Sequence, residues 1–483
     1  MDIVNQKWSD DYFSREREKV LAMWPTGKEV NLDEAVEYHK SLPGSLNAAL
    51  KVQEAKAEGV SYFLASSGTD TIEGHKELLL YLKNEAGVHI VTTYIDSLTR
   101  NCRFKDAEQG LKKARETGKA ALNGFPIVLH GIKGSREIIE AAALPVLILG
   151  PTPDVRLTCE IGLAGGHSGY SGGPLIAFWN YTKDIPVEKI IYNFQYLNRL
   201  MGYYEENGIP LLYCVSGAMP SISPPSIMIA PEIIEVLIAA EQGTKHIQLN
   251  NWVQGNISQD VAYILTLKKL ALEYLDKFGY RDVETTTLSV CPTGRFPVDQ
   301  AQTFGLIAHF TITGILGGVQ VISTRTIDEA LQIPTKEGIT ESFKCVKAAA
   351  GMLQPQALDI LDSKAVKSET YMMEKEVKAI LDKVIEMGDG DLVIGTKKAV
   401  KAGVLDQPYA TTQYVKGKVM GVKDARGAAR FFDCGYLPFD KEIFDYHKDK
   451  IAQREKKTGK KVDYGTVIKD MTAISTGSIL PGE

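Results

Sequence analysis

An arginine at the end of one β-rich segment is the residue of this sequence best suited to bind an acid. Arg100 ends the run VHIVTTYIDSLTR (88–100), in which β-branched residues give way to a loop. A guanidinium group donates two parallel charge-assisted hydrogen bonds to a carboxylate. The ends of nearby β-rich segments, Ser66–Gly68 and Leu149–Gly150, contain no cation. We therefore predict that Arg100 binds an anionic group with little cationic help.

Two further arginines follow β-rich segments. Arg295 and Arg325, together with Arg100, place cations at three such ends, which suits an anionic substrate or cofactor. The alternative is that each arginine forms an ion pair with a structural acid. The predictions for Arg295 and Arg325 therefore depend on which acids lie beside them in the fold.

A glycine-rich segment at 165–173 offers two weaker signals. Its backbone N–H groups could bind phosphate, but the Gly-Lys-Ser/Thr ending of a P-loop is absent. Within it, 169–173 matches Gly-x-Ser-x-Gly, a motif that requires a strand directly before it and a helix directly after. Here glycines precede the motif and the β-rich run PLIAFW follows, so we attribute the match to chance.

Composition excludes several classes of protein. The chain has 483 residues, a net charge of −5 and 44% apolar residues, which is typical of a globular protein and argues against nucleic acid or anionic membrane as a partner. No apolar run approaches the roughly 20 residues that span a bilayer. The N-terminus is polar and shows no signal peptide, so we expect a cytoplasmic protein.

The residues that usually bind metals are scattered. The six cysteines include no Cys-x-x-Cys pair, and the eight histidines include no His-x-x-x-His. We therefore expect no metal centre built by the protein itself. No pair of carboxylates at hydrolase spacing stands out either.

The order of elements predicts the fold. Between residues 61 and 330, β-rich runs alternate with amphipathic helical segments at 73–85, 187–206, 231–242 and 259–278, a pattern of parallel strands with crossover helices. Eight such units fit a closed (β/α)8 TIM barrel, with a doubly wound open sheet as the alternative. The candidate strands are SYFLASSG, VHIVTTYID, PIVLHG, PVLILG, PLIAFW, PLLYCVSG, HIQLNN, VETTTLSV and GVQVIST. One of these nine is in excess, and PLIAFW (174–179) is the weakest.

The α/β barrel is predicted to carry extensions at both ends. Residues 1–55 form a helical lead-in, residues 56–350 the barrel, and residues 351–483 an α+β extension packed on it, with long helices at 367–387 and near 448–461. A barrel places its chemistry on the loops after the strands. Because those loops offer groups that bind acids but few groups that react, a cofactor is expected to supply the chemistry.

Several blocks of sequence resemble the large (epsilon) subunit of glutamate mutase, also called methylaspartate mutase. They are WPTGKEV (24–30), YIDSLTRN (94–101), LNGFP (122–126), YYEENG (203–208), AAEQG (239–243), IPTKE (333–337) and GDLVIGT (390–396). The blocks are colinear and span nearly the whole chain. The resemblance implies a (β/α)8 barrel and a radical rearrangement of a carbon skeleton, which interconverts glutamate and 3-methylaspartate in the family.

The resemblance also implies a cofactor and partners. The family uses adenosylcobalamin, which holds the cobalt and lies between the barrel chain and a small cobalamin-binding subunit. That subunit's signature, Asp-x-His-x-x-Gly, is absent from this sequence, so a separate small chain is expected. The family further suggests a homodimer of this chain within a heterotetramer.

Residue by residue, the family's substrate-binding positions are only partly kept. Arg100 matches one of three carboxylate-binding arginines and Tyr181 one of two tyrosines. The other two arginines fall at Ser66 and Leu149, and the family's glutamate and first tyrosine at Ser171 and Ala177. Arg295, where the family typically has glycine, is a candidate replacement.

The adenosyl-contacting positions are better kept. Asn123, Glu329 and Ile333 match, the family's lysine is replaced by Arg325, and Gly68 is retained at the barrel mouth. Burying a carboxylate without a partner costs several kcal/mol. We therefore expect a mutase acting on an acid with one anionic group and a larger or less polar remainder. The alternatives are a true glutamate mutase with a rearranged grip and a silent barrel that supports a cobalamin-binding partner.

Overall fold

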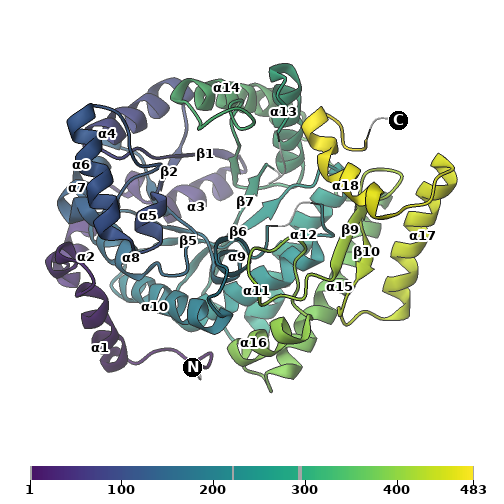
Figure 1. Cartoon of the computed structure of the whole chain (residues 1–483), viewed down its shortest axis with the longest axis horizontal. Coiled ribbons are helices and arrows are strands. Elements are labelled where there is room, and N and C mark those ends of the chain that lie inside the picture. The colour runs from purple at the N-terminus through teal and green to yellow at the C-terminus, as the bar shows by residue number, and fades with distance from the viewer. Residues whose placement is uncertain (1–2, 220–221, 292–295, 482–483) are drawn as a thin grey trace.

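The central element is a closed barrel of eight parallel strands, β1 to β8 in chain order, shown in Figure 1. We describe it from a computed structural model that covers residues 3–219, 222–291 and 296–481. The strands are β1 (Tyr62–Ser67), β2 (Ile90–Tyr94), β3 (Val146–Leu149), β4 (Gly169–Ser171), β5 (Leu212–Cys214), β6 (His246–Trp252), β7 (Glu284–Val290) and β8 (Val321–Ser323). The predicted (β/α)8 barrel is confirmed, and the open sheet is excluded.

Helices on the outside of the barrel connect the strands. They are α4 (Ile72–Tyr81) with a π-turn at Leu82–Ala86, α5 (Ser97–Arg100), α6 (Phe104–Thr117), α7 (Ile127–Ala142), α8 (Arg156–Ala164), α9 (Pro174–Tyr181), α10 (Val187–Glu206), α11 (Ser226–Glu241), α12 (Ile257–Lys277), α13 (Gln300–Leu316) and α14 (Lys336–Leu353). The predicted segment 187–206 coincides with α10. The segment 73–85 covers α4 and most of its π-turn, 259–278 matches α12 to within two residues at each end, and 231–242 matches the end of α11, which begins five residues earlier at Ser226.

Two of the nine predicted strands are helical. PIVLHG forms the start of α7, and PLIAFW forms α9. The strand that sequence reasoning missed is β4, inside the glycine-rich segment. A short apolar run fits a buried helix as well as a strand. Pro126 at the N-cap of α7 and Pro174 in the first turn of α9 are features of helix starts, and they identify the helices in retrospect.

The barrel interior is closed at its amino end by α3 (Ala48–Glu58). The preceding helices α1 (Asp10–Leu21) and α2 (Leu32–Ser41) pack on α8 outside the barrel, and 3-10 turns at Pro25–Glu29 and Gly44–Leu46 follow them. Ala48, Ala49 and Val52 of α3 pack against inward residues of the strands, including Leu64 and Leu147. This apolar cluster closes the amino end of the barrel, so a ligand must enter from the carboxyl end of the strands.

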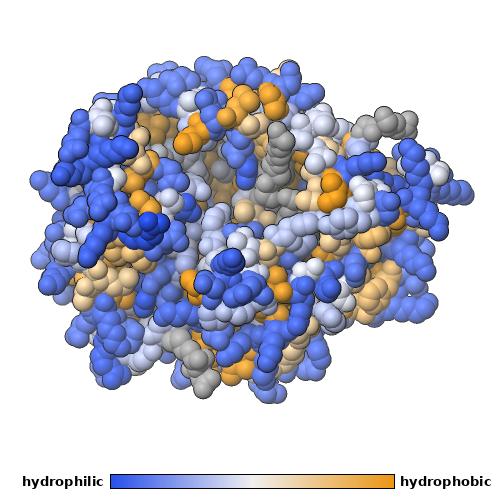
Figure 2. Space-filling view, in the orientation of Figure 1, coloured by the Kyte–Doolittle hydropathy of each residue, from blue (hydrophilic) through white to orange (hydrophobic). Residues whose placement is uncertain are grey.

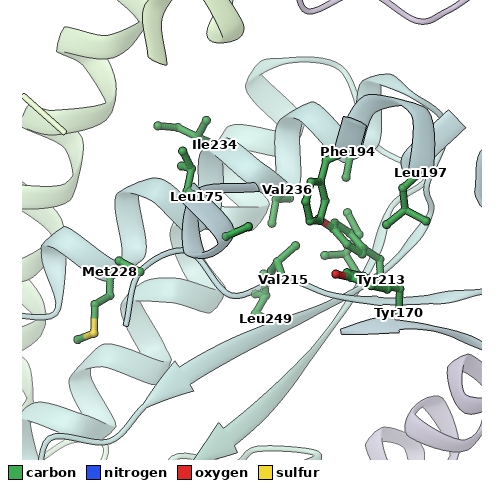
Figure 3. Close-up of a cluster of buried hydrophobic side chains, with 14 of the residues drawn as sticks. Tyr170, Leu175, Phe194, Leu197, Tyr213, Val215, Met228, Ile234, Val236 and Leu249 are labelled. Atoms are coloured by element: carbon green, nitrogen blue, oxygen red, sulfur yellow. The ribbon is translucent and has the colours of Figure 1, made fainter. Parts of the chain in front are cut away.

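The outer face of the sheet packs on the helices. Tyr170 of β4 and Tyr213 of β5 lie beside Phe194 and Leu197 of α10, and Leu249 of β6 completes the cluster (Figure 3). Side chains alternate between the two faces of a strand. Because these residues face outward, their neighbours in sequence face the barrel interior.

The C-terminal extension lies on one side of the barrel (Figure 1). It comprises a 3-10 turn at Gln354–Gln356, α15 (Lys364–Met387), α16 (Leu392–Ala402), the antiparallel pair β9 (Val419–Lys423) and β10 (Ala429–Cys434), α17 (Lys441–Thr458), α18 (Tyr464–Ala473) and a 3-10 turn at Ile474–Thr476. Buried Arg430 donates to Glu369 of α15 and to Asp424. Gln259 of α12 contacts the same Glu369 at 3.3 Å. These contacts attach the extension to the barrel.

Substituting Gly169 is expected to disrupt the barrel. Its φ is +155°, and a Cβ atom there would lie 2.0 Å from the carbonyl oxygen of Leu212 on β5. We predict that Gly169→Ala destabilises the chain by about 3 kcal/mol or more, because the pairing of β4 with β5 must separate. Thermal unfolding of the purified chain measures the effect.

The matched control is Gly305→Ala on the exposed side of α13, where an added Cβ has no neighbour within 4 Å. That change should stabilise by about 0.5–1 kcal/mol, since alanine favours helix over glycine. An unchanged unfolding midpoint for Gly169→Ala would contradict the close pairing of β4 and β5.

Candidate functional site at the barrel mouth

Arg100 lies at the end of a short helix that follows β2. Asp96 caps this helix, α5, by accepting hydrogen bonds from the backbone N–H groups of Leu98 and Thr99 at 2.9 and 3.0 Å. The Asn123 side chain accepts a further bond from Ser97 N–H at 2.9 Å. Together these bonds fix α5 at the carboxyl end of the barrel, and the Arg100 backbone with it.

The Arg100 side chain makes no ion pair among the residues that the structure describes. Its Nε is buried without a hydrogen-bond partner, and its guanidinium carbon lies 5.5 Å from the centre of the Tyr94 ring. The neighbouring acid, Asp96, uses one carboxylate oxygen to cap the helix, and burial raises its pKa. The described residues therefore do not support the alternative that Arg100 forms a structural ion pair.

Tyr181, at the end of α9, is close enough to Arg100 and Tyr94 for both to affect its pKa. Burial raises the pKa of the Tyr181 phenol to about 12, Tyr94 contributes in the same direction, and Arg100 and Arg325 oppose the shift. The hydroxyl therefore stays protonated near neutral pH and can donate a hydrogen bond. It makes no hydrogen bond to any of the described residues, so this donor is available to a ligand.

The other predicted substrate positions differ in where they point. Ser66, Leu149 and Ser171 occupy inward positions near the carboxyl ends of β1, β3 and β4, and each is half-buried. Ala177 is fully buried in the core around α9. Arg295 lies outside the described residues. The barrel thus brings Ser66, Leu149, Ser171, Tyr181 and Arg100 to one end, which appears as a hollow in the face bordered by α5 and α9 (Figure 2).

The predicted cofactor positions form a neighbouring sector of the rim, on the loops after β8, β1 and β2. Arg325 donates to Glu329 at 2.6 Å and lies 5.9 Å above the Phe296 ring, so this arginine does have an acid partner. Ile333 is 77% exposed and Asn123 is exposed. The sector presents a carboxylate, a guanidinium, an amide and an apolar side chain to the mouth.

Gly68 is required by the fold itself. A Cβ at this position would lie 2.5 Å from the Tyr94 carbonyl oxygen and 3.2 Å from the Gly124 Cα. The glycine therefore permits the loops after β1 and β2 to pack together, whether or not a ligand also lies close to it.

The Gly-x-Ser-x-Gly match has more structural context than the sequence indicated. A strand, β4, contains Ser171, and a helix, α9, begins at Pro174. A nucleophilic serine also needs a base. Each of the eight histidines is in the described part of the chain and bonds to a group other than Ser171. The serine is therefore not arranged as a hydrolase nucleophile.

Sequence reasoning missed two buried carboxyl groups behind the mouth. Glu235 of α11 accepts hydrogen bonds from the backbone N–H groups of Leu175 and Ser216 at 2.7 and 3.3 Å, and Glu232 accepts one from Asn250 N–H at 2.6 Å. Burial raises the pKa of Glu235 to about 8. The available signal was a pair of acids three residues apart in the middle of a mostly apolar helix, SIMIAPEIIEVLIAAE.

The fold and the site define a (β/α)8 barrel protein with a buried arginine, unpaired among the described residues, at the carboxyl end of its strands. Among proteins of known name, this chain is 38% identical over 481 residues to the glutamate mutase epsilon subunit of Desulfitobacterium hafniense, covering 99% of both chains. It is also 38% identical to that of Treponema denticola, over 99% of this chain and 98% of the relative. The corresponding Escherichia coli O157:H7 protein is 35% identical over 99% of both chains.

Residues 42–482 match the sequence model of the methylaspartate mutase E chain family. The chain belongs to this family of mutases, and the resemblance found in the sequence is confirmed. No helix among the described residues is long and apolar enough to cross a membrane. In the same part of the chain, no three histidine, cysteine or acidic side chains converge in a way that could hold a metal ion.

The raised pKa of Glu235 predicts a pH-dependent stability. Between the pKa of about 4.5 for an ordinary glutamate and about 8 here, the folded chain binds more protons than the unfolded chain. Its free energy of unfolding therefore falls as pH rises through this window. Glu235→Gln keeps an oxygen acceptor and stays neutral, so its unfolding temperature should fall less between pH 5.5 and 8.5.

The control is Glu108→Gln, on an exposed face of α6, which should leave the wild-type pH dependence unchanged. A residual slope in Glu235→Gln is expected because burial also raises the pKa of Glu232 and of Asp260. Equal slopes for wild type and Glu235→Gln would contradict the prediction.

Proposed function

We propose that this chain is the large subunit of an adenosylcobalamin-dependent carbon-skeleton mutase, whose barrel binds an acid through one carboxylate. The observation that carries the proposal is the guanidinium of Arg100, which lies at the mouth with no acid partner among the described residues. Family membership supports the mutase activity, since the matched relatives are named glutamate mutase epsilon subunits.

Substrate binding is assigned to the residues around Arg100. Its planar fork holds the carboxylate, and the protonated Tyr181 hydroxyl donates a further hydrogen bond. Ser66 and Ser171 present small hydroxyl groups, and Leu149 presents an apolar wall. Arg295 is proposed as a further contact from the loop after β7. These groups accommodate one charge and a less polar remainder, which distinguishes this pocket from one built for two carboxylates and an ammonium group.

The rim residues suit a nucleoside. The Glu329 carboxylate can accept hydrogen bonds from ribose hydroxyls, and Arg325 and the Asn123 amide nitrogen can donate to ring or hydroxyl acceptors. Ile333 offers an exposed apolar surface for a base. When bound, adenosylcobalamin would supply the radical chemistry of the rearrangement. The chain's own part is to orient the substrate and to exclude water around it.

A partner chain is part of the proposal. The sequence has no Asp-x-His-x-x-Gly motif, so a small cobalamin-binding subunit with that motif is expected to cover the mouth. The matched relatives are named as subunits, which implies partner chains for those proteins. By analogy, two copies of this chain and two small chains would assemble.

Two other functions are distinguishable. A true glutamate mutase, with its carboxylate-binding residues at other positions, would bind glutamate tightly and convert it to 3-methylaspartate. A silent barrel would bind the small subunit without catalysis, and its adenosyl-facing residues would have no use. Retention of Asn123 and Glu329 at the family's adenosyl-contacting positions favours an active site over a silent scaffold, because a scaffold has no need of adenosyl contacts.

The reconstituted complex provides the main test. The chain is mixed with the small subunit and adenosylcobalamin, and a panel of monocarboxylic and dicarboxylic acids is screened by EPR for the coupled cob(II)alamin and organic radical signal. We expect the signal with acids that carry one carboxylate. A signal and turnover with glutamate would establish the glutamate mutase instead, and no signal with any acid would favour the scaffold.

Substitution of Arg100 tests its role. Arg100→Met removes two charged hydrogen bonds of about 1.5–3 kcal/mol each, so the affinity for the activating acid should fall by about 100-fold or more. Arg100→Lys keeps the charge without the planar fork and should show a smaller loss. Isothermal titration measures both.

Arg103→Met is the control, because Arg103 is exposed three residues further on and pairs with Asp106 at 2.7 Å. It should bind the acid like wild type. Equal affinities for Arg100→Met and Arg103→Met would exclude Arg100 from the site.

A further inference from the structure

The pairing register of the strands defines a layer of side chains beneath Arg100. In a closed eight-stranded barrel, inward side chains lie in layers to which alternate strands contribute. One such layer is apolar and consists of Leu64, Leu147, Cys214 and Leu288. The next inward positions toward the mouth, on the intervening strands β2, β4, β6 and β8, are Thr92, Ser171, Asn250 and Ser323. We call these four residues the floor layer.

The floor layer is wholly polar and carries no charge. It presents three hydroxyl groups and one amide, directly above an apolar layer that is sealed from below by α3. One step nearer the mouth, Ser66 of β1 and Ser216 after β5 add two hydroxyl groups, and Leu149 of β3 and Val290 of β7 add two apolar side chains. A pocket that only received hydrocarbon would not need polar side chains at this depth.

Two atoms of the floor layer have unused hydrogen-bonding capacity. Thr92 Oγ1 and Asn250 Oδ1 are buried and have no partner among the described residues, and the residues are 1% and 3% exposed. Asn250 Nδ2 donates to Ser216 Oγ at 2.9 Å, which fixes the amide group. Buried polar atoms in folded proteins are almost always paired with protein, water or ligand. A polar group of a bound ligand could form hydrogen bonds with both of these atoms.

The floor layer discriminates between charged and neutral groups. An ionised carboxylate buried at this depth would need a cation. Among the residues that the structure describes, the mouth offers Arg100, which holds the first carboxylate, and Arg325, which already pairs with Glu329. A hydroxyl, amide or carbonyl group needs only neutral donors and acceptors, which Thr92, Ser171 and Asn250 supply.

We infer that the substrate is a monocarboxylic acid whose other end carries a neutral polar group, a hydroxyl, amide or carbonyl, hydrogen-bonded in the floor layer. The inference rests on the proposed function, because it takes Arg100 as the carboxylate-binding group. It specifies what the remainder of the substrate contains, and so separates this pocket both from a dicarboxylate site and from a purely apolar one.

The test compares acids that share one carboxylate and differ at the other end. Glutarate, glutaramate, 5-hydroxypentanoate and pentanoate are titrated into the full chain, alone and with the small subunit and adenosylcobalamin, and their four- and six-carbon homologues extend the series. We expect glutaramate or 5-hydroxypentanoate, or a homologue, to bind at least tenfold more tightly than pentanoate and about 100-fold more tightly than glutarate.

A matched pair of variants locates the effect. Thr92→Val removes the unpartnered hydroxyl from the floor layer at nearly constant volume, and should weaken the neutral polar ligands by about tenfold while leaving pentanoate unchanged. Thr286→Val makes the same change below the apolar layer, at an inward β7 position whose hydroxyl is likewise buried without a partner. It should leave every affinity unchanged.

Three outcomes would overturn the inference: glutarate or pentanoate as the tightest ligand, equal effects of Thr92→Val and Thr286→Val, or no binding of any member of the series at millimolar concentration. These outcomes are separable from failure of the proposed function. A chain that shows the expected binding order but no cob(II)alamin signal with any acid would keep the pocket assignment and lose the radical chemistry.

Discussion

Closure of an eight-stranded parallel barrel allows each strand to send only every second side chain inward, and the stagger between strands decides which of these meet. In this chain that constraint determines the character of the pocket. The outward face of β4 and β5 carries Tyr170 and Tyr213, which pack on α10, and the inward face must then carry Ser171 and Cys214. A slip of one residue would exchange a hydroxyl-lined interior for a bulky aromatic one. The tight pairing of Gly169 with Leu212 holds the register at this point.

Above that interior, the described residues of the site combine one unpaired cation with neutral donors. Arg100 is held by a helix that Asp96 caps, and Tyr181 is kept protonated by burial. The acids that burial makes hardest to ionise, Glu232 and Glu235, lie behind the strands and bind backbone N–H groups at the ends of β5 and β6 and the start of α9. They brace the mouth without presenting negative charge to it. A single anionic group bound by Arg100 therefore meets little electrostatic competition.

Several elements were predictable from their residues alone. The helix 187–206 has its apolar residues on a continuous face and was located to the residue. The strands β2 and β7 are rich in β-branched residues, and β1 and β6 combine apolar or aromatic residues with flanking turn residues. The sequence alone could not assign the secondary structure of PIVLHG and PLIAFW. A run of six mostly apolar residues is too short for its periodicity to distinguish a strand from a helix. The strand β4 has only three residues, two of them small, and its identity depends on neighbours distant in sequence.

The sequence by itself determined the fold class and the family, because alternation of elements and colinear motifs are local properties of the chain, and it predicted Arg100 as a carboxylate-binding residue. It also indicated that Ser66 and Leu149 stand where a dicarboxylate site would have cations. Only the tertiary structure decided that Arg325 is paired and Arg100 is not, since ion pairing depends on which side chains the loops bring together. The floor layer likewise exists only in three dimensions. Thr92, Ser171, Asn250 and Ser323 come from four strands spread over most of the barrel, and closure of the sheet alone places them in one plane.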